Sequence, residues 1–439
     1  MLPALFLSVR VPTLLARWWR TLACEKTNSR LPGTECLSII IFRLDAMGDV
    51  VMTTPLFREI KRAFPQSRLT VVVQPEYRPL LITSSHVDET LTTPALKAGF
   101  LARRVKNLLA ALLLYARSLR RRRFDIAISP RWDTDEHLAT LLCLLTNATC
   151  RVGYTEKASA TKQQLNRGFD AAFNLCLPAG PARHEVIRNL VMVEALGGTV
   201  HDSRLEVRLT GRDREFAFRL LASFPPSTRL IALGIGAACP GRRWPLERYA
   251  ECINRLGQQF LLQPVIVCSS GEEQDAQRLA TLLFCPPLIL AGKALRQVCA
   301  VLERCDLFLG NDSGPAHLAA AMDCKTIVIS RHPRNGDPIN ANSPLRFGPY
   351  CRSARVLQPA TGLDACRDGC RVAGPHCITT VPVEEVVIAA QAMLGGGKST
   401  HIKAVIVSED FSRSRRTPIT EVLARYQGAV PGMRWSNSS

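Results

Sequence analysis

Short apolar runs alternate with longer helix-patterned segments along most of this chain, and this alternation limits its fold more than any other feature. The first series contains strands predicted at 37–43, 68–73 and 124–130 and helices predicted at 51–64 and 101–122. Short buried strands separated by helical segments are typical of parallel βαβ units. The sequence therefore predicts an α/β fold of doubly wound parallel sheets.

A second series of the same kind begins with a strand predicted at 229–237 and continues to a strand at 325–330. A helix predicted at 184–198 closes the first series, and a polar stretch at 205–215 resembles a linker that leads into a helix. A chain of 439 residues is long enough for two domains. We predict an N-terminal extension at 1–36, a first domain at 37–205, a linker at 206–228, a second domain at 229–397 and a basic tail at 398–439.

Two common phosphate-binding fingerprints are missing from the sequence. Neither series has G-x-G-x-x-G after its first strand, and G-x-x-x-x-G-K-[ST] does not occur. Both a nicotinamide enzyme and a P-loop phosphotransferase are therefore disfavoured.

The segment "LGNDSGPAHLAAAM" (309–322) predicts an anion site at the start of a helix. Pro315 suits the first helical turn, whose free N–H groups point outward. Ser313 and His317 add side-chain donors, whereas Asp312 would repel a diphosphate and is better suited to capping the turn or holding a sugar hydroxyl. The alternative is an ordinary capped helix start.

Arg242 and Arg243 lie in a Gly/Pro loop, "GAACPGRRWP", directly after the first strand of the second series. Open α/β sheets bind ligands at the carboxyl ends of their strands. These arginines could therefore neutralise the phosphates of a nucleoside diphosphate, or form an ordinary solvated loop.

The first predicted strand runs into "FRLDAMGDVVMTT", a turn with two carboxylates, Asp45 and Asp49. Asp49 could cap the following helix, since Asp is a preferred N-cap residue. It could equally be a general base facing a cleft between the two domains. The local sequence leaves both interpretations open.

The formal net charge of +19 indicates an anionic partner, which could be a nucleic acid, an acidic membrane or a phosphorylated substrate. Aromatic residues are only 6% and do not alternate with basic ones, so nucleic acid is not expected. The basic run at 117–123 is either a solvated helix end or a surface that faces an anion or a membrane.

No apolar run reaches the length that spans a bilayer. The N-terminal segment, with Trp18 and Trp19, could form an amphipathic helix on a membrane or a loosely attached extension. Most of the 16 cysteines are isolated in apolar segments, which suits a reducing cytosol. Cys366, Cys370 and Cys377 have poor zinc spacing and are interpreted as packing thiols, with a metal or a disulfide as the alternative.

Together, "IIIFRLDAMGDVVMTTPLFREIKRAFP", "GAACPGRRWP", "GNDSGPAHLAAA" and "CRDGC…C…VPVEEV" resemble glycosyltransferase family nine, the ADP-heptose:lipopolysaccharide heptosyltransferases, over about residues 37–395. The resemblance implies a GT-B fold, in which two Rossmann-like domains face each other across a cleft. It also implies a metal-independent, inverting transferase that uses no cofactor. The implied partners are a nucleotide-sugar donor and an anionic glycolipid acceptor, with the protein in the cytoplasm and in peripheral contact with the membrane.

The resemblance assigns roles to individual residues. Asp49 matches the catalytic base, which takes the proton of the acceptor hydroxyl. The predicted donor-binding residues are Arg242, Arg243, Glu272, Lys293, Asp312, Ser313, Gly314 and His317. The predicted acceptor-binding residues are Arg131, Asp133 and His184.

The sequence departs from the family pattern in two places. Asp45 and Ala46 stand where small hydroxyl residues are common, and "SRHPRNGDPINANSPLRFGPY" replaces a shorter loop. Two alternatives to a glycosyltransferase therefore stay open. One is another nucleotide-sugar enzyme, such as an epimerase, and the other is a non-catalytic basic α/β binding protein.

Overall fold

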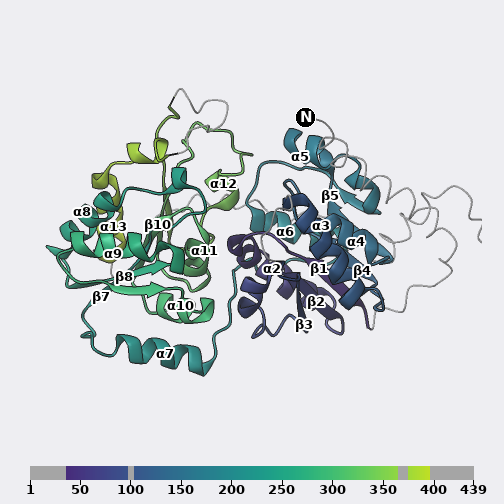
Figure 1. Ribbon diagram of the computed structural model, residues 1–439, viewed down its shortest axis with the longest axis horizontal. Coiled ribbons are helices and arrows are strands. Elements are labelled where there is room, and N and C mark those ends of the chain that lie inside the picture. The colour runs from purple at the N-terminus through teal and green to yellow at the C-terminus, as the bar shows by residue number, and fades with distance from the viewer. Residues whose placement is uncertain (1–35, 97–102, 364–373, 396–439) are drawn as a thin grey trace, which may run out of the picture.

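The computed structural model describes residues 36–96, 103–363 and 374–395, which form two α/β halves lying side by side (Figure 1). Among these residues, no helix is long and apolar enough to cross a membrane. Four features interpreted from the sequence lie outside the described residues. They are the N-terminal segment with Trp18 and Trp19, Cys366, Cys370 and the tail at 398–439.

The first half is built on a six-stranded parallel sheet in the order β3-β2-β1-β4-β5-β6. Its strands are β1 (Ser38–Phe42), β2 (Arg68–Val73), β3 (Glu89–Thr92), β4 (Ile126–Ser129), β5 (Cys150–Tyr154) and β6 (Leu175–Leu177). Its helices are α2 (Met47–Ala63), α3 (Arg103–Leu114), α4 (Ala139–Leu145), α5 (Ala160–Leu165) and α6 (Glu185–Ala195).

The second half repeats this architecture with a sheet in the order β12-β11-β10-β7-β8-β9. Its strands are β7 (Arg229–Gly234), β8 (Leu262–Cys268), β9 (Leu288–Ala291), β10 (Leu307–Asn311), β11 (Thr326–Ile329) and β12 (Ala354–Leu357). Helices α8 (Leu246–Gly257), α9 (Glu273–Leu282), α10 (Leu295–Leu302), α11 (Gly314–Ala321), α12 (Pro344–Phe347) and α13 (Val383–Gly395) accompany it.

Counted from its own first strand, each sheet has the order 3-2-1-4-5-6 of a Rossmann fold, and all pairs are parallel. The order reverses between β1 and β4 in one sheet and between β7 and β10 in the other. Ligands of such sheets bind where the order reverses, at the carboxyl ends of the strands. The predicted doubly wound fold is confirmed. Asp49 follows β1 and Arg131 follows β4, while Arg242 follows β7 and Asp312 follows β10.

Strand β1 shows why these segments form central parallel strands. Ile39 and Ile41 pack on one face in the same cluster as residues of α2 and α6. Ile40 and Phe42 pack on the other face with residues of α3 and α4. All four side chains are fully buried, because helices cover both faces of the sheet.

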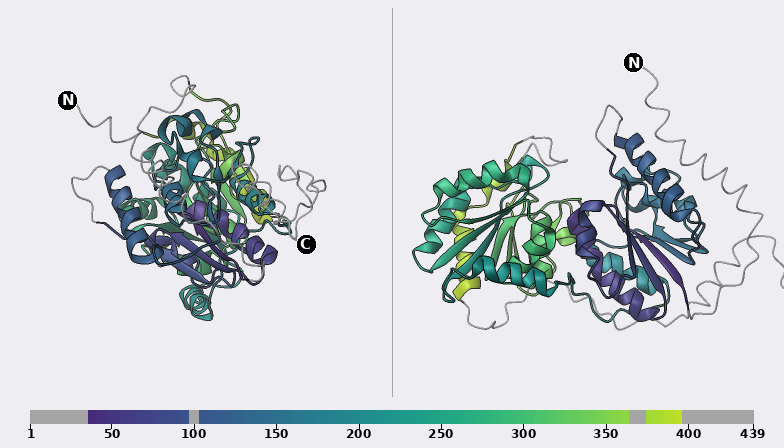
Figure 2. Two further views of the ribbon diagram at one scale, coloured as in Figure 1. Left: turned by 90° about the vertical axis from the view of Figure 1, so that its right-hand side faces the viewer. Right: turned by 60° about the horizontal axis from the view of Figure 1, so that its bottom comes forward.

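The two halves are joined by a continuous core rather than by a linker alone. One hydrophobic cluster contains residues of α2 and α6 in the first half and of α10 and α11 in the second. Figures 1 and 2 show α2 and α11 meeting at the junction, and these helices are in contact. The predicted linker at 206–228 contains helix α7 (Gly211–Leu221), which packs against α10.

Two helix boundaries differ from the prediction, and the first of them affects the site. Helix α2 begins at Met47 rather than at residue 51, so Asp49 lies inside its first turn. Helix α3 ends at Leu114 and continues as a π-helical turn over Tyr115–Leu119.

Candidate active site

Asp49 lies in the first turn of α2, directly beyond the carboxyl end of β1. Its Oδ2 accepts a hydrogen bond from the backbone N–H of Ala46 at 3.2 Å, so the carboxylate does help to cap the helix. Its Oδ1 accepts a second bond from Arg43 Nη2 at 3.2 Å. Arg43 also donates to the Asp49 backbone carbonyl and is fully buried. The cap and the arginine fix the direction of the Asp49 side chain.

Arg131 comes from the end of β4, across the point where the strand order reverses, and reaches the same carboxylates. Its Nη1 lies 3.5 Å from Asp49 Oδ1, and its Nε lies 3.4 Å from Asp45 Oδ1. Arg43 Nη1 lies 3.3 Å from Asp45 Oδ2. Two guanidinium groups therefore stand between two carboxylates. The structure thus gives Asp45, which departs from the family pattern, a partner role in this cluster.

The pKa values of the two carboxyl groups are shifted in opposite directions by this cluster and its burial. Burial would raise the pKa of Asp45, but Arg131 and Arg43 more than offset it, and that pKa lies below its ordinary value. Burial raises the pKa of Asp49, and the charge of Asp45 adds to this, while Arg43 and Arg131 offset only part of the rise. A carboxylate with a raised pKa is a stronger proton acceptor, so Asp49 suits a general base better than Asp45 does.

The N-terminus of α11 supplies the second part of the site. Ser313 is the N-cap residue with extended backbone angles, but its side chain makes no capping bond. Ser313 Oγ and His317 Nδ1 are both buried without a hydrogen-bond partner. Burial, assisted by His184, lowers the pKa of His317 to about 4, so its ring is neutral near pH 7. Buried unpaired polar atoms at a helix N-terminus indicate a polar or anionic ligand there.

The two helix starts touch across the junction of the halves. A Cβ added at Gly48 would lie 2.5 Å from Cδ2 of His317. A Cβ added at Gly314 would lie 2.1 Å from Cε of Met47. Position 48 therefore needs glycine for this close approach to a buried ring, whereas at Gly314 the flexible end of Met47 could move aside. As a result, Asp49 lies beside the start of α11, although Asp49 and His317 are 268 positions apart in the sequence.

Arg242 and Arg331 provide the positive charge on the second-half side of the site. Burial raises the pKa of Asp312, and Arg242 and Arg331 offset part of this rise through their charges. Arg242 also donates a hydrogen bond to Asn342 Oδ1. Asn342 and Arg331 belong to the segment that departs from the family pattern, so that segment lies against Arg242 and Asp312.

Asn311 connects the two loops of the second half. It is fully buried at the end of β10. Its Oδ1 accepts bonds from the backbone N–H of Trp244 at 2.9 Å and from Tyr249 Oη at 3.0 Å. Its Nδ2 donates to the carbonyl of Ile235 at 2.7 Å. These bonds fix the loop with Arg242 against the start of α11.

The remaining predicted donor residues lie after β7, β8 and β9 of the second sheet. Glu272 lies beneath Gly236, accepts bonds from Ser269 and pairs with Arg243 at 3.5 Å. Arg243 also donates to the carbonyl of Ala237 at 3.0 Å. Lys293 is exposed in the turn after β9. Arg243 and Glu272 are thus brought together, and Lys293 follows Gly292, whose backbone packs against Ser270 near Glu272.

The predicted acceptor residues have different surroundings. Arg131 belongs to the carboxylate cluster. Asp133 pairs with Arg346, whose side chain reaches it from α12 of the second half with Nη2 2.7 Å from Asp133 Oδ2. His184 Nδ1 accepts from the N–H of Val186, and its Nε2 lies 2.9 Å from the Gly348 carbonyl. Both ring nitrogens of His184 are therefore engaged in the structure.

Three buried polar residues of the site were not predicted from the sequence: Arg43, Asn311 and Arg346. Arg346 is fully buried, pairs with Glu185 at 2.6 Å and stacks over Trp132 with its guanidinium carbon 4.5 Å from the ring centroid. For Arg43, the pattern that could have indicated a site residue was a charged residue directly after an apolar run, as in "IIIFR". No comparable signal existed for Arg346, whose partners are distant in sequence.

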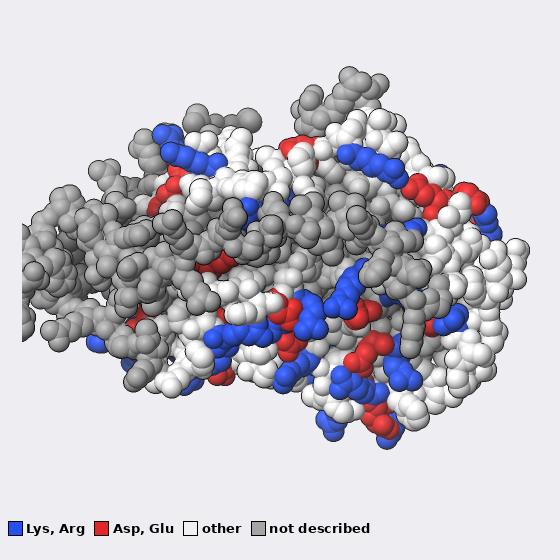
Figure 3. All heavy atoms as spheres, turned by 180° about the vertical axis from the view of Figure 1, so that it is seen from behind, with Lys and Arg blue, Asp and Glu red and all other residues white. Residues whose placement is uncertain are grey.

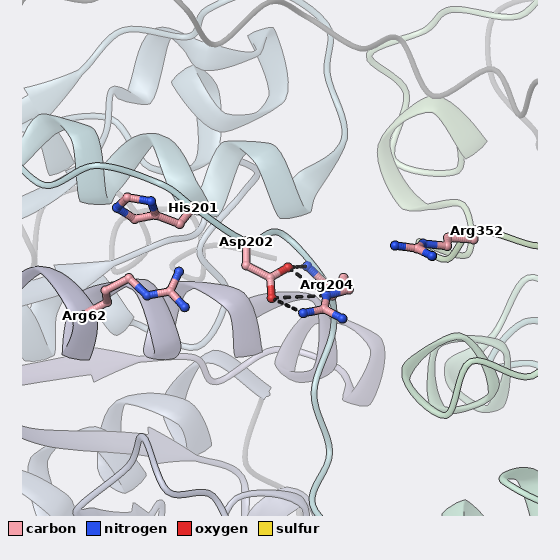
Figure 4. Close-up of a pocket in the computed structure, with 5 residues that line it drawn as sticks. All are labelled: Arg62, His201, Asp202, Arg204 and Arg352. Carbon is pink, nitrogen blue, oxygen red and sulfur yellow. Dashed lines mark hydrogen bonds and ion pairs between the residues drawn. The ribbon is translucent and has the colours of Figure 1, made fainter.

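A separate hollow of about 790 Å³ lies away from these residues and is shown in Figure 4. It is lined by Arg62, His201, Asp202, Arg204 and Arg352. Asp202 pairs with Arg204 at 2.9 Å, and this hydrogen-bonded pair lowers the pKa of Asp202 to about 2. None of the predicted site residues lines this hollow.

Two Rossmann-like halves, with a carboxylate cluster on one and an unsatisfied helix N-terminus on the other, are the arrangement expected of a glycosyltransferase of the GT-B fold. Comparison with solved structures supports the fold. A glycosyltransferase of family 9 from Veillonella parvula matches with a TM-score of 0.66, at 21% identity over 84% of this chain and 99% of that one. An Escherichia coli heptosyltransferase solved with ADP matches with a TM-score of 0.58, at 18% identity over 81% of this chain and 100% of that one.

The chain belongs to glycosyltransferase family 9, the heptosyltransferase family, whose model matches residues 113–368. It is also 27% identical to a lipopolysaccharide core heptosyltransferase, OpsX, of Haemophilus influenzae, over 71% of this chain and 82% of that protein. The predicted family and the prediction of a glycosyltransferase are confirmed. Asp49 lies before the matched range, so its role depends on the geometry described above.

Proposed function

We propose that this protein transfers a heptose from ADP-heptose to the core of a lipopolysaccharide, with inversion and without a metal. The observation that carries this proposal is the contact of Gly48 with His317. It holds the Asp49 carboxylate next to a helix start that has unpartnered Ser313 and His317 atoms. This contact supports a candidate base and a candidate anion site that face the same junction and act on one acceptor hydroxyl and one donor.

In the proposed reaction, the acceptor hydroxyl oxygen attacks the anomeric carbon of the donor sugar. Asp49 takes the hydroxyl proton as the new C–O bond forms. The bond between the anomeric carbon and the diphosphate oxygen breaks, and the electron pair leaves with the nucleoside diphosphate. The N–H groups at the start of α11, with Arg242 and Arg331, stabilise that added negative charge.

The donor is assigned to the second half. The α11 start with Ser313, Gly314 and His317 is proposed to bind the diphosphate. Glu272 is proposed to accept hydrogen bonds from the ribose and Lys293 to lie near the base. Asp312, whose raised pKa reflects burial, is better placed to hold a sugar hydroxyl than a phosphate. The choice of ADP is supported by the Escherichia coli structure with ADP, which shares this fold.

The acceptor is assigned to the first half, as an anionic glycolipid at the cytoplasmic face of a membrane. Arg131 has 23% of its side chain exposed and lies between the two carboxylates, so it is proposed to contact the acceptor. For Asp133 and His184, the contacts with Arg346 and Gly348 support an indirect role, in which they position the acceptor side of the site.

A donor panel tests the proposal. Thermal shifts of the full chain are measured with ADP-, GDP-, UDP- and dTDP-linked sugars, followed by transfer assays with a lipopolysaccharide-core acceptor. We expect selective stabilisation by ADP-heptose and release of ADP only when acceptor is present. Selective stabilisation by a different nucleotide sugar would overturn the donor assignment, and isomerisation without transfer would overturn the reaction.

A further inference from the structure

Helix α3 exposes an apolar stripe on its outer face. Its inner side is fixed by Ala111 and Leu114, which are buried against the first sheet with Ile40 and Phe42. On the opposite side, Val105, Leu109 and Leu112 are 43%, 40% and 39% exposed. These positions have i, i+4 and i+7 spacing and share one face of the helix. A surface helix normally presents polar residues there, so the stripe calls for an apolar contact.

Basic side chains surround both ends of this stripe. The basic residues near its two ends are Arg103, Arg104, Lys106, Arg117, Arg120, Arg121, Arg122 and Arg123. Within the described part of the chain, Arg103 pairs with Glu136 and Arg122 with Glu89. Arg117, Arg120, Arg121 and Arg123 form no ion pair with a described residue. An excess of unpaired positive charge next to an apolar stripe favours an anionic, amphipathic partner.

The stripe leads into a hollow of about 350 Å³ that is lined by arginines. Ala116, four residues after Leu112, lines it together with Arg117, Ser118, Arg120, Arg121 and Arg122. An apolar strip that ends in an arginine-lined hollow matches a lipid, which joins an acyl region to a phosphate headgroup. On the face that Figure 3 shows, basic and acidic side chains of the second half lie next to one another.

We propose that the outer face of α3 and the following arginine turn form a docking surface for an anionic phospholipid bilayer. In this arrangement, Val105, Leu109 and Leu112 contact the interfacial apolar region, and Arg117, Arg120 and Arg121 bind lipid phosphates. The surface lies on the half that carries Asp49. This docking proposal rests on the proposed function in one respect, which is that the acceptor lies in a membrane.

Vesicle binding of the full chain tests this surface. The vesicles contain phosphatidylcholine alone or with phosphatidylglycerol, and neither a sugar acceptor nor a nucleotide sugar is present. We expect binding only to the anionic vesicles, with loss at high salt. Arg120→Glu combined with Arg121→Glu should weaken binding by at least about thirtyfold, and Leu109→Ser combined with Leu112→Ser by about tenfold.

Helix α7 offers a matched control, because Phe218 is 62% exposed there and Arg219 is a surface arginine. Phe218→Ser with Arg219→Glu should leave vesicle binding unchanged. Unchanged melting temperature and unchanged donor binding confirm that the α3 variants are folded. The proposal is overturned if neither vesicle type binds, if both bind equally, or if the α3 variants bind like the parent chain. Since no sugar substrate is present, these outcomes are independent of the transfer reaction.

Discussion

Gly48 of the first half lies against the imidazole of His317 of the second, so closely that a Cβ at Gly48 would lie 2.5 Å from His317 Cδ2. The contact brings together two helix starts, one with a carboxylate base candidate and one with unpartnered polar atoms.

Substitution Asp49→Asn should lower kcat by about 10²–10⁴-fold, because the amide cannot accept the proton of the acceptor hydroxyl. Donor binding, measured by thermal shift, should be retained. Asp45→Asn is the matched control, since Asp45 contacts the same two arginines, and it should cost much less. Transfer by Asp49→Asn at the parent rate would remove Asp49 as the base.

The pH dependence of kcat/KM should have an acid limb that belongs to Asp49. The base acts only when ionised, so activity falls as the pH falls through its pKa, which is raised above the ordinary 3.8. Asp45→Asn removes a repelling charge and should shift the limb to lower pH. Arg131→Leu removes an attracting charge and should shift it to higher pH. Limbs that coincide in all three proteins would contradict this assignment.

Replacing Gly48 by Ala should raise KM for the donor, because the added methyl group meets the buried His317 ring and separates the halves. Overpacking of this kind costs about 1–3 kcal/mol. Gly314→Ala should be milder, since it meets the flexible end of Met47. Gly211→Ala, in open space on α7, is the control. Adding His317→Ala to Gly48→Ala should restore stability, and no recovery would exclude this contact as the cause.

Arg346→Met should destabilise the protein by about 1–3 kcal/mol, because it removes the partner from the second half and leaves Glu185 with Arg188 alone, 3.2 Å away. Chemical denaturation measures this loss. A double-mutant cycle with Glu185→Gln should show strong coupling. The exposed pair Arg219–Glu215 serves as a control, for which the coupling should be within about 1 kcal/mol. Equal coupling in the two pairs would rule out a special role for Arg346.

Much of the fold could be predicted from the sequence, because it depends on local patterns. The apolar runs of β1 and β10 and the Gly-Pro helix start of α11 lie within short stretches. Shorter elements, such as β3 and β6, lack a clear pattern and were not predicted. Helix α2 begins four residues earlier than predicted. Its N-cap residue is Ala46, whose side chain cannot cap the helix, so the sequence gives no cap signal at that position.

The sequence alone determined that the chain forms two doubly wound halves and which turns carry chemistry, because strand, helix and turn signals are local. It left Asp49 between a helix cap and a base. Only the tertiary structure placed Arg131, 82 residues away in sequence, on that carboxylate. It also brought Arg346 of the second half to Glu185 of the first, 161 residues away in sequence. Such contacts depend on how two sheets and their covering helices pack, and no local pattern encodes that arrangement.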